Sequence, residues 1–220
     1  MNAIVLFGDV IRSRRDSSGS TAWLRTLAEE LATIYPASER LAEFEFTQGD
    51  EIQGLLAPSA DPVAAALRSA LHPARRPMRW VAVAGDVDPG RGPATQRTGS
   101  AFLRARDLIE EAAARREGLL LSSGDPATDD LLGDVAPLLT ELLGDLTDRQ
   151  RVIGRLLLVE GLRRSEVAER LNVSRATISV AADRAHMRSL GRLAGALHTM
   201  FANGVEAASR RTVLKPEAVE

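Results

Sequence analysis

Cysteine is absent from this 220-residue sequence, and histidine occurs only three times. Without cysteine the chain can form no disulfide, no thiolate metal site and no cysteine nucleophile. The scarcity of histidine argues against a zinc enzyme, since cysteine and histidine are the usual zinc ligands. No apolar run approaches the ~20 residues of a membrane span, and the first residues lack the basic start of a signal peptide. We therefore expect a cytoplasmic protein with no membrane partner.

Lysine is nearly absent as well: Lys215 is the only one, and arginine supplies the other basic residues. The net charge is −2, but residues 1–140 are acidic on balance, whereas residues 146–211 carry 12 arginines against 6 acids. An acidic front half joined to a basic back half is typical of a sensor or catalytic module fused to a nucleic-acid-binding module. A solvated helical face is the alternative interpretation of the basic stretch.

Hydrophobic residues make up 45% of the sequence, which is enough for a buried core. Their spacing in residues 1–124 alternates between strand and helix patterns. We predict strands at 3–7, 43–47, 52–57, 79–85 and 119–122, and helices at 21–34, 61–71 and 99–116. The strands at 43–47 and 52–57 form a hairpin. This order favours an α+β fold with an antiparallel or mixed sheet covered by helices on one face.

From residue 125 onward the pattern is helical throughout. We predict a helical linker at 125–145, with its helix at 129–143, and then an all-α domain at 146–203. The helices of that domain are expected at 146–159, 165–171 and 175–200. Residues 204–220 are polar, and we expect them to form a flexible tail.

The all-α domain contains the local signals of a helix-turn-helix. Thr147 is a good N-cap, with Gln150 three residues later as its capping-box partner. Val167, Ala168 and Leu171 form the inner face of the first short helix, and the small side chain of Ala168 suits a close helix crossing. Asn172 lies at the turn, where a positive φ is expected. Ser174 caps the next helix, whose Ile178 and Ala181 point inward.

The segment RRSEVAERLNVSRATIS at 163–179, with the preceding LTDRQR, resembles the region-4 helix-turn-helix of sigma factors and the related domains of response regulators. In such a motif the N-terminal residues of the second helix enter the major groove of DNA. The resemblance implies contacts to bases and phosphates of double-stranded DNA from Arg163, Arg164, Ser174, Arg175, Thr177, Ser179 and Arg184. A contact with RNA polymerase, or a helical hairpin that binds no DNA, is the alternative.

Two carboxylates stand out in the front half. Asp9 ends the first strand, and Asp50 lies at the tip of the hairpin with Glu51 beside it. If the first strand lies next to the hairpin, Asp9 and Asp50 converge, and paired carboxylates can hold Mg²⁺ or Mn²⁺ over a triphosphate. Gly8 and Gly49 would let a nucleotide approach the backbone closely. Aspartates are also common in turns and caps, which is the structural alternative.

The order of LFGDV, TQGDE, MRWVAVAGDV and GSAFLRARDLIEEA resembles the class III nucleotidyl cyclase and GGDEF diguanylate cyclase superfamily, and more closely the SatD family. That resemblance covers about residues 1–122 and implies a ferredoxin-like, cyclase-palm-like sheet. It also implies a metal pair at Asp9 and Asp50, and nucleotide contacts from Gly8, Arg12, Ser13, Arg14 and Gly49.

The sequence departs from the cyclase pattern where transition-state groups are needed. Leu103 replaces the catalytic asparagine, Asp107 falls at the position of the transition-state arginine, and the substrate-selecting lysine has no counterpart. Without groups that stabilise developing charge, binding can persist without rapid turnover. We therefore expect a homodimeric DNA-binding transcriptional regulator whose front domain binds a ligand or nucleotide or mediates dimerisation. A metal-dependent nucleotidyl cyclase or related nucleotidyl transferase is the alternative.

Overall fold

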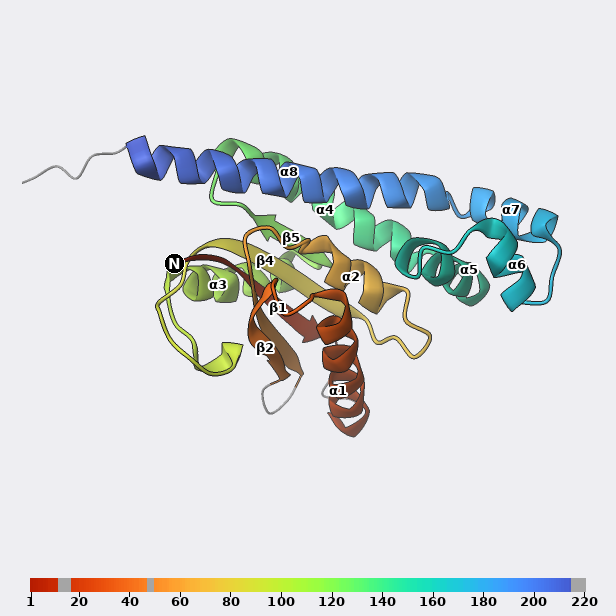
Figure 1. Ribbon diagram of the computed structural model, residues 1–220, viewed down its shortest axis with the longest axis horizontal. Helices are drawn as coiled ribbons and strands as arrows, with labels where there is room; N and C mark the ends of the chain where they lie inside the picture. The colour runs from red at the N-terminus through yellow and green to blue at the C-terminus, as the bar shows by residue number, and fades with distance from the viewer. Residues whose placement is uncertain (12–16, 47–49, 215–220) are drawn as a thin grey trace, which may run out of the picture.

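The computed structural model describes residues 1–11, 17–46 and 50–214, and it has a mixed α+β architecture (Figure 1). One five-stranded sheet has the strand order β2-β3-β1-β4-β5. Only β4 and β5 pair in parallel. The strands are β1 Asn2–Val10, β2 Arg40–Phe46, β3 Glu51–Leu56, β4 Met78–Asp86 and β5 Leu119–Ser122. The predicted α+β class is confirmed, and the predicted strand at 119–122 has the observed bounds.

In the described ranges three α-helices lie between the strands in sequence, and five follow the last strand. They are α1 Ser17–Ile34, α2 Val63–Ala70, α3 Ser100–Arg115, α4 Pro126–Gly144, α5 Asp148–Gly154, α6 Arg164–Arg170, α7 Arg175–Arg184 and α8 Met187–Leu214. A short 3₁₀ helix, η2 Ala94–Gln96, precedes α3, and a π-helical turn, η3 Arg155–Val159, follows α5. None of the helices in the described ranges is both long enough and apolar enough to cross a membrane.

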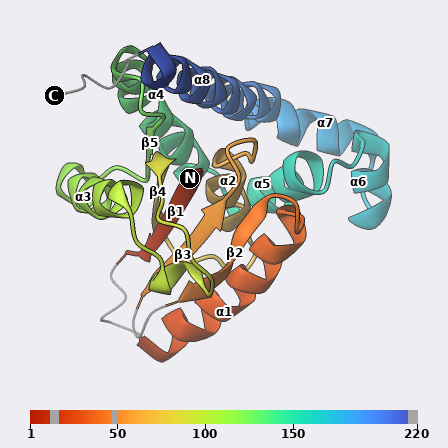
Figure 2. The same ribbon diagram turned by 60° about the vertical axis from the view of Figure 1, so that its left-hand side comes forward.

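Both faces of the sheet are covered, so our expectation of helices on one face only is wrong. β1 is central and buried on both sides, as its nearly continuous apolar run requires. Ile4 and Leu6 point to the face that α1, α2 and α4 cover, whereas Val5 and Phe7 point to the face that α3 covers (Figure 2).

The second face is covered because of the hand of one connection. α2 joins β3 to β4 and α3 joins β4 to β5; both connections link parallel strands and step in the same direction across the sheet. Two such crossovers place their helices on one face when they have the same hand, and here the helices lie on opposite faces, so the hands differ. The usual right-handed preference predicts one face. α4 packs against β5 on the face that α3 leaves open.

The C-terminal helix also differs from expectation. The single helix predicted at 175–200 is interrupted at Ala185 and His186, where His186 has a positive φ of 50°. α8 then returns along α4 to the sheet, and its Leu197, Phe201 and Val205 are buried in the core shared with α1 and α2. The expected flexible tail is therefore wrong for residues 204–214, because α8 continues through them and Gly204 and Val205 are buried. Residues 215–220 lie outside the described residues.

Candidate functional site

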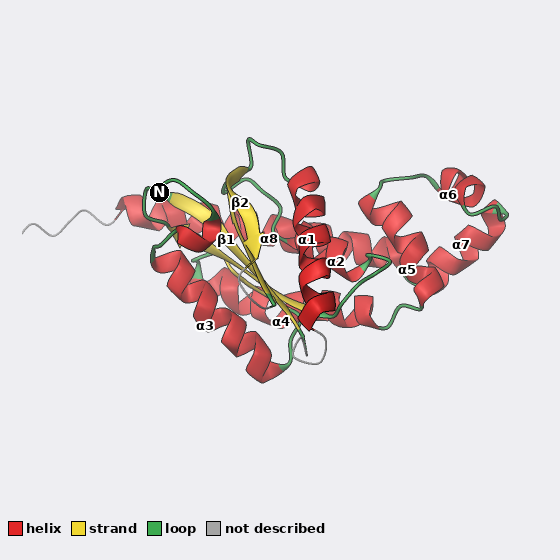
Figure 3. Ribbon diagram, turned by 90° about the horizontal axis from the view of Figure 1, so that it is seen from below, coloured by secondary structure: helices red, strands yellow, loops and turns green. Residues whose placement is uncertain are grey.

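α6 and α7 project from the end of the molecule away from the sheet (Figures 1 and 3). The turn between them is built as the sequence predicts. Asn172 has a φ of 51°, a conformation that asparagine tolerates better than most residues. The Ser174 hydroxyl accepts a hydrogen bond from the Thr177 amide at 3.1 Å and so caps α7. The capping box of Thr147 and Gln150 at the start of α5 is also present.

The contact between α6 and α7 depends on small and aliphatic side chains. Val167 and Ala168 of α6 are buried, as are Ile178 and Ala182 of α7. Ala181, which we expected to point inward, is only half-buried. The residue four positions after Ile178 lies closer to the same helical face than the residue three positions after it, which explains the difference.

The N-terminal turns of α7 offer polar side chains to solvent. Arg175 and Thr177 are exposed and Ser179 is half-buried. Within the described part of the chain, Arg175 forms no ion pair. Thr177 shares a 2.9 Å hydrogen bond with the Ser174 hydroxyl, so these two side chains are ordered by the cap itself. A guanidinium that forms no ion pair, on the first turn of an exposed helix, can bind a phosphate or the edge of a guanine base.

The other arginines implied by the resemblance differ in how far they are engaged. Arg163 contacts Glu166 at 2.9 Å, and Arg164 contacts Asp183 of α7 at 2.7 Å. The hydrogen bond from Arg163 lowers the pKa of the Glu166 carboxyl. Arg184 is exposed and has no ion pair among the residues that the structure describes. Arg163 and Arg164 would therefore have to exchange a carboxylate for a phosphate on binding DNA.

A half-buried ion cluster that the sequence analysis missed joins this helical part to the sheet part. The carboxylate of Glu30 on α1 accepts hydrogen bonds from Arg68 at 2.9 Å and from Arg155 at 3.0 Å. His72 lies 3.1 Å from the same carboxylate, and its Nδ1 accepts a hydrogen bond from the Ala74 amide. The proton of the neutral imidazole therefore sits on Nε2, facing Glu30.

The electrostatics of this cluster keep Glu30 ionised and His72 neutral. Burial alone would raise the pKa of Glu30, but the hydrogen bonds from Arg155 and Arg68 outweigh it and lower that pKa. Burial lowers the pKa of His72, against the opposing effect of Glu30. From Arg155 the ionic contacts continue to Glu160 at 3.5 Å, and Glu160 contacts Arg170 of α6 at 2.7 Å. The cluster thus links α1 and α2 to the helix that precedes the turn.

The expected carboxylate site lies at the end of β1. Asp9 is opposite Glu51 of β3 and Arg79 of β4, and its carboxylate contacts Arg79 at 2.9 Å. Burial raises the pKa of Asp9, the hydrogen bond from Arg79 lowers it, and the charge of Asp50 raises it again, so that the net shift is upward. Within the described ranges no three His, Cys, Asp or Glu side chains are grouped to hold a metal ion. The cation that balances Asp9 here is Arg79, and Mg²⁺ or Mn²⁺ would have to displace it.

Of the remaining predicted nucleotide contacts, Gly8 alone lies among the residues that the structure describes. Gly8 has a packing reason of its own, because a Cβ there would lie 2.8 Å from the Trp80 ring and 2.9 Å from Ile52. Its contact with a nucleotide stays a prediction. Leu103, at the position of the catalytic asparagine in the cyclase pattern, lies on α3 and is 71% exposed. Arg12, Ser13, Arg14 and Gly49 lie outside the described residues.

Comparisons with known proteins identify no family. No family model matches the chain, and no curated protein matches it. One matching solved structure is a regulator of polyketide synthase expression from Bifidobacterium adolescentis. The two chains share 15% sequence identity with a TM-score of 0.26, and the match covers 90% of this chain and 80% of that one. Similarity at this level carries no argument about this chain.

Proposed function

We propose that this protein is a DNA-binding transcriptional regulator in which α6 and α7 act as a helix-turn-helix. The observation that carries the proposal is Arg175, directly after the Ser174 cap on the first turn of α7, which is exposed and forms no ion pair with any residue that the structure describes. In this proposal α7 enters the major groove with Arg175 and Thr177 at base edges, and Ser179 reaches the groove wall. Arg184 and the paired arginines Arg163 and Arg164 contact phosphates.

The position of the unit supports this use. α6 and α7 stand clear of the sheet, so a duplex can approach them without meeting it (Figure 3). The excess of arginine in residues 146–211 supplies the general attraction to phosphates. The ion cluster around Glu30 connects Arg155, in the turn after α5, with α1 and α2. In this proposal a conformational change in the sheet part alters the orientation of α6 and α7 through these contacts.

For the sheet part we propose a regulatory role. The order β2-β3-β1-β4, with α1 and α2 as crossovers on one face, supports the ferredoxin-like palm that we propose for this part. Its task in this proposal is to bind a ligand or to pair two copies of the chain, and so to set the affinity for DNA.

The test is a DNA titration by fluorescence anisotropy over a range of salt concentrations, with duplexes drawn from the genome that encodes the protein. We expect binding that weakens with salt, with a logarithmic slope of about 0.9 per phosphate contact. Arg175→Ala should weaken binding by about 1–3 kcal/mol. Arg210→Ala is the matched control, since Arg210 is an exposed arginine paired with Glu206 far from α7. Equal affinities for the two variants, or no binding at all, would contradict the proposal.

A second candidate function is the binding of a nucleotide with Mg²⁺ or Mn²⁺ at Asp9 and Asp50. The observation that favours it is the placement of Asp9 at the end of β1 with the charge of Asp50 nearby: burial raises the pKa of Asp9, the charge of Asp50 raises it further, and a bound cation would oppose both effects. Calorimetry with Mg²⁺ and a panel of nucleotides is the test. Heat that disappears in Asp9→Asn supports the site, and no heat with any nucleotide rejects it.

A further inference from the structure

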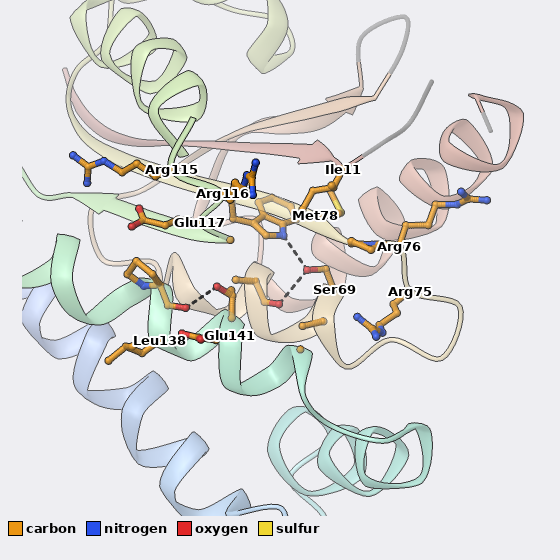
Figure 4. A pocket seen from close by; sticks show the side chains of 18 of the residues that line it. Ile11, Ser69, Arg75, Arg76, Met78, Arg115, Arg116, Glu117, Leu138 and Glu141 are labelled. Carbon is orange, nitrogen blue, oxygen red and sulfur yellow. Dashed lines mark hydrogen bonds between the residues drawn. The ribbon is translucent and has the colours of Figure 1, made fainter. Parts of the chain in front are cut away.

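A groove runs along the outer edge of the sheet, where β5 is the last strand. α3 forms one bank and α4 the other, because these helices lie on opposite faces of the sheet. Along β5 the groove has a floor of Leu120, Leu121 and Ser122. Past the start of β5, near Gly118, it continues into a cavity of about 700 Å³ that α4 and the end of α3 also border (Figure 4).

The two banks carry opposite charge. On the α3 bank Arg104 and Arg115 flank Glu111, which contacts both, so that the bank keeps a net positive charge. On the α4 bank Asp130 and Asp134 are exposed and form no ion pair with any described residue. α4 as a whole contains no basic residue.

α4 also exposes apolar side chains, of which Leu138 lines the cavity. Leu131, Leu138 and Leu142 of α4 are 55%, 47% and 49% exposed, and their spacing puts them on one face of the helix. Exposed leucines flanked by charges of one sign are typical of a protein contact surface.

We infer that this groove is the contact surface between two copies of the chain, related by a two-fold axis parallel to β5. Such a rotation exchanges the faces of the sheet, so that α3 of one copy lies against α4 of the other. The rotation leaves the position of each residue along the strand direction unchanged. A residue on the α3 bank of one copy therefore lies opposite the α4-bank residues of the other copy that line the same stretch of the groove. Arg104 and Arg115 then face Asp130 and Asp134 of the second copy, and the contact forms twice.

The charges decide between this arrangement and the other simple one. A two-fold axis perpendicular to the sheet would place α4 against α4, with Asp130 and Asp134 opposite the same acids. A foreign helix with a basic flank could satisfy the α4 bank alone, but it would leave the excess positive charge of the α3 bank without an acidic partner. A second copy satisfies both banks at once.

Charge reversal tests the inference in the full-length protein by sedimentation velocity. One variant, Arg104→Glu with Arg115→Glu, makes both banks acidic, and the other, Asp130→Arg with Asp134→Arg, makes both basic. Each variant alone should sediment as a monomer at concentrations where the wild type is a dimer, with a dimer dissociation constant raised by about a hundredfold or more. An equimolar mixture should form a heterodimer, because every contact again joins opposite charges. Arg25→Glu, an exposed site on α1, is the control and should remain dimeric.

The mixture keeps the test decisive, since restored dimers prove that both variants are folded. A wild type that is monomeric at 100 μM, a reversed variant that stays dimeric alone, or two folded variants that fail to pair would each overturn the inference. Circular dichroism of the separate variants establishes the folding that the last outcome requires.

Discussion

Removing the charge of Glu30 should destabilise the protein because three partners depend on this one carboxylate. Its side chain is 19% exposed, and those of Arg68 and Arg155 are 16% and 15% exposed. In Glu30→Gln the two guanidinium groups would face each other and an amide, without the anion between them. Breaking a buried ion pair by removing one partner costs about 3–5 kcal/mol. Since a fifth of the Glu30 side chain remains in contact with solvent, we expect about 2–3 kcal/mol.

Urea unfolding followed by circular dichroism measures this loss as a lower midpoint with an unchanged slope. For a chain of this size the loss corresponds to a melting temperature lower by about 4–12 °C. Glu29→Gln is the matched control, because Glu29 is the exposed neighbour on the same helix. If Glu30→Gln loses less than about 0.5 kcal/mol, or no more than Glu29→Gln, the cluster does not hold the two parts together.

Three further perturbations follow from the geometry. Because the folded state lowers the pKa of His72 below its ordinary value of 6.5, it binds fewer protons than the unfolded state, so stability should fall as the pH is lowered through 6.5. Urea titrations at several pH values should show this dependence, and His72→Gln should lose it. Asn172→Ala should cost about 1 kcal/mol at its positive φ, whereas Asn172→Gly should not, as thermal melts would show. Gly8→Ala should cost about 1–3 kcal/mol through its clash with Trp80, while Gly133→Ala, in open space on α4, should be neutral or stabilising; equal melting temperatures would refute the packing argument.

Local features of the fold could be predicted from the sequence because short-range chemistry determines them. The strand at 119–122 and the helix at 99–116 follow from apolar periodicity, and α3 is observed within one residue of the expected bounds. The caps at Thr147 and Ser174 and the positive φ of Asn172 follow from side chains that satisfy free backbone groups or tolerate that conformation.

The long-range features could not be predicted in this way. The face that α3 covers depends on the hand of its crossover, which the periodicity of the helix does not encode. The Glu30 cluster joins residues 125 positions apart in the sequence. The anchoring of Val205 depends on α4 having turned back over the sheet. Each of these contacts exists only once the chain is folded, so no local pattern marks it.

The candidate DNA-binding residues show the same division. Arg175 is exposed because it is the first residue of α7, directly after the N-cap Ser174, where the helix begins. The engagement of Arg164 with Asp183 depends on how α6 crosses α7, and sequence spacing alone did not indicate it. The exposure of a side chain that depends on its own helix was predictable from the sequence. An ion pair that depends on how two helices cross was not.

Selection from a random pool of duplex DNA tests the central claim most directly, because it requires no knowledge of the target promoter. Wild-type protein should enrich a defined sequence over successive rounds. Arg175→Ala, with its helix cap intact, should enrich a sequence that is relaxed at one base position, as expected when a guanidinium that reads a base is removed. Failure of the wild type to enrich any sequence, or the same sequence with and without Arg175, would contradict the assignment of α7 as the helix that reads DNA.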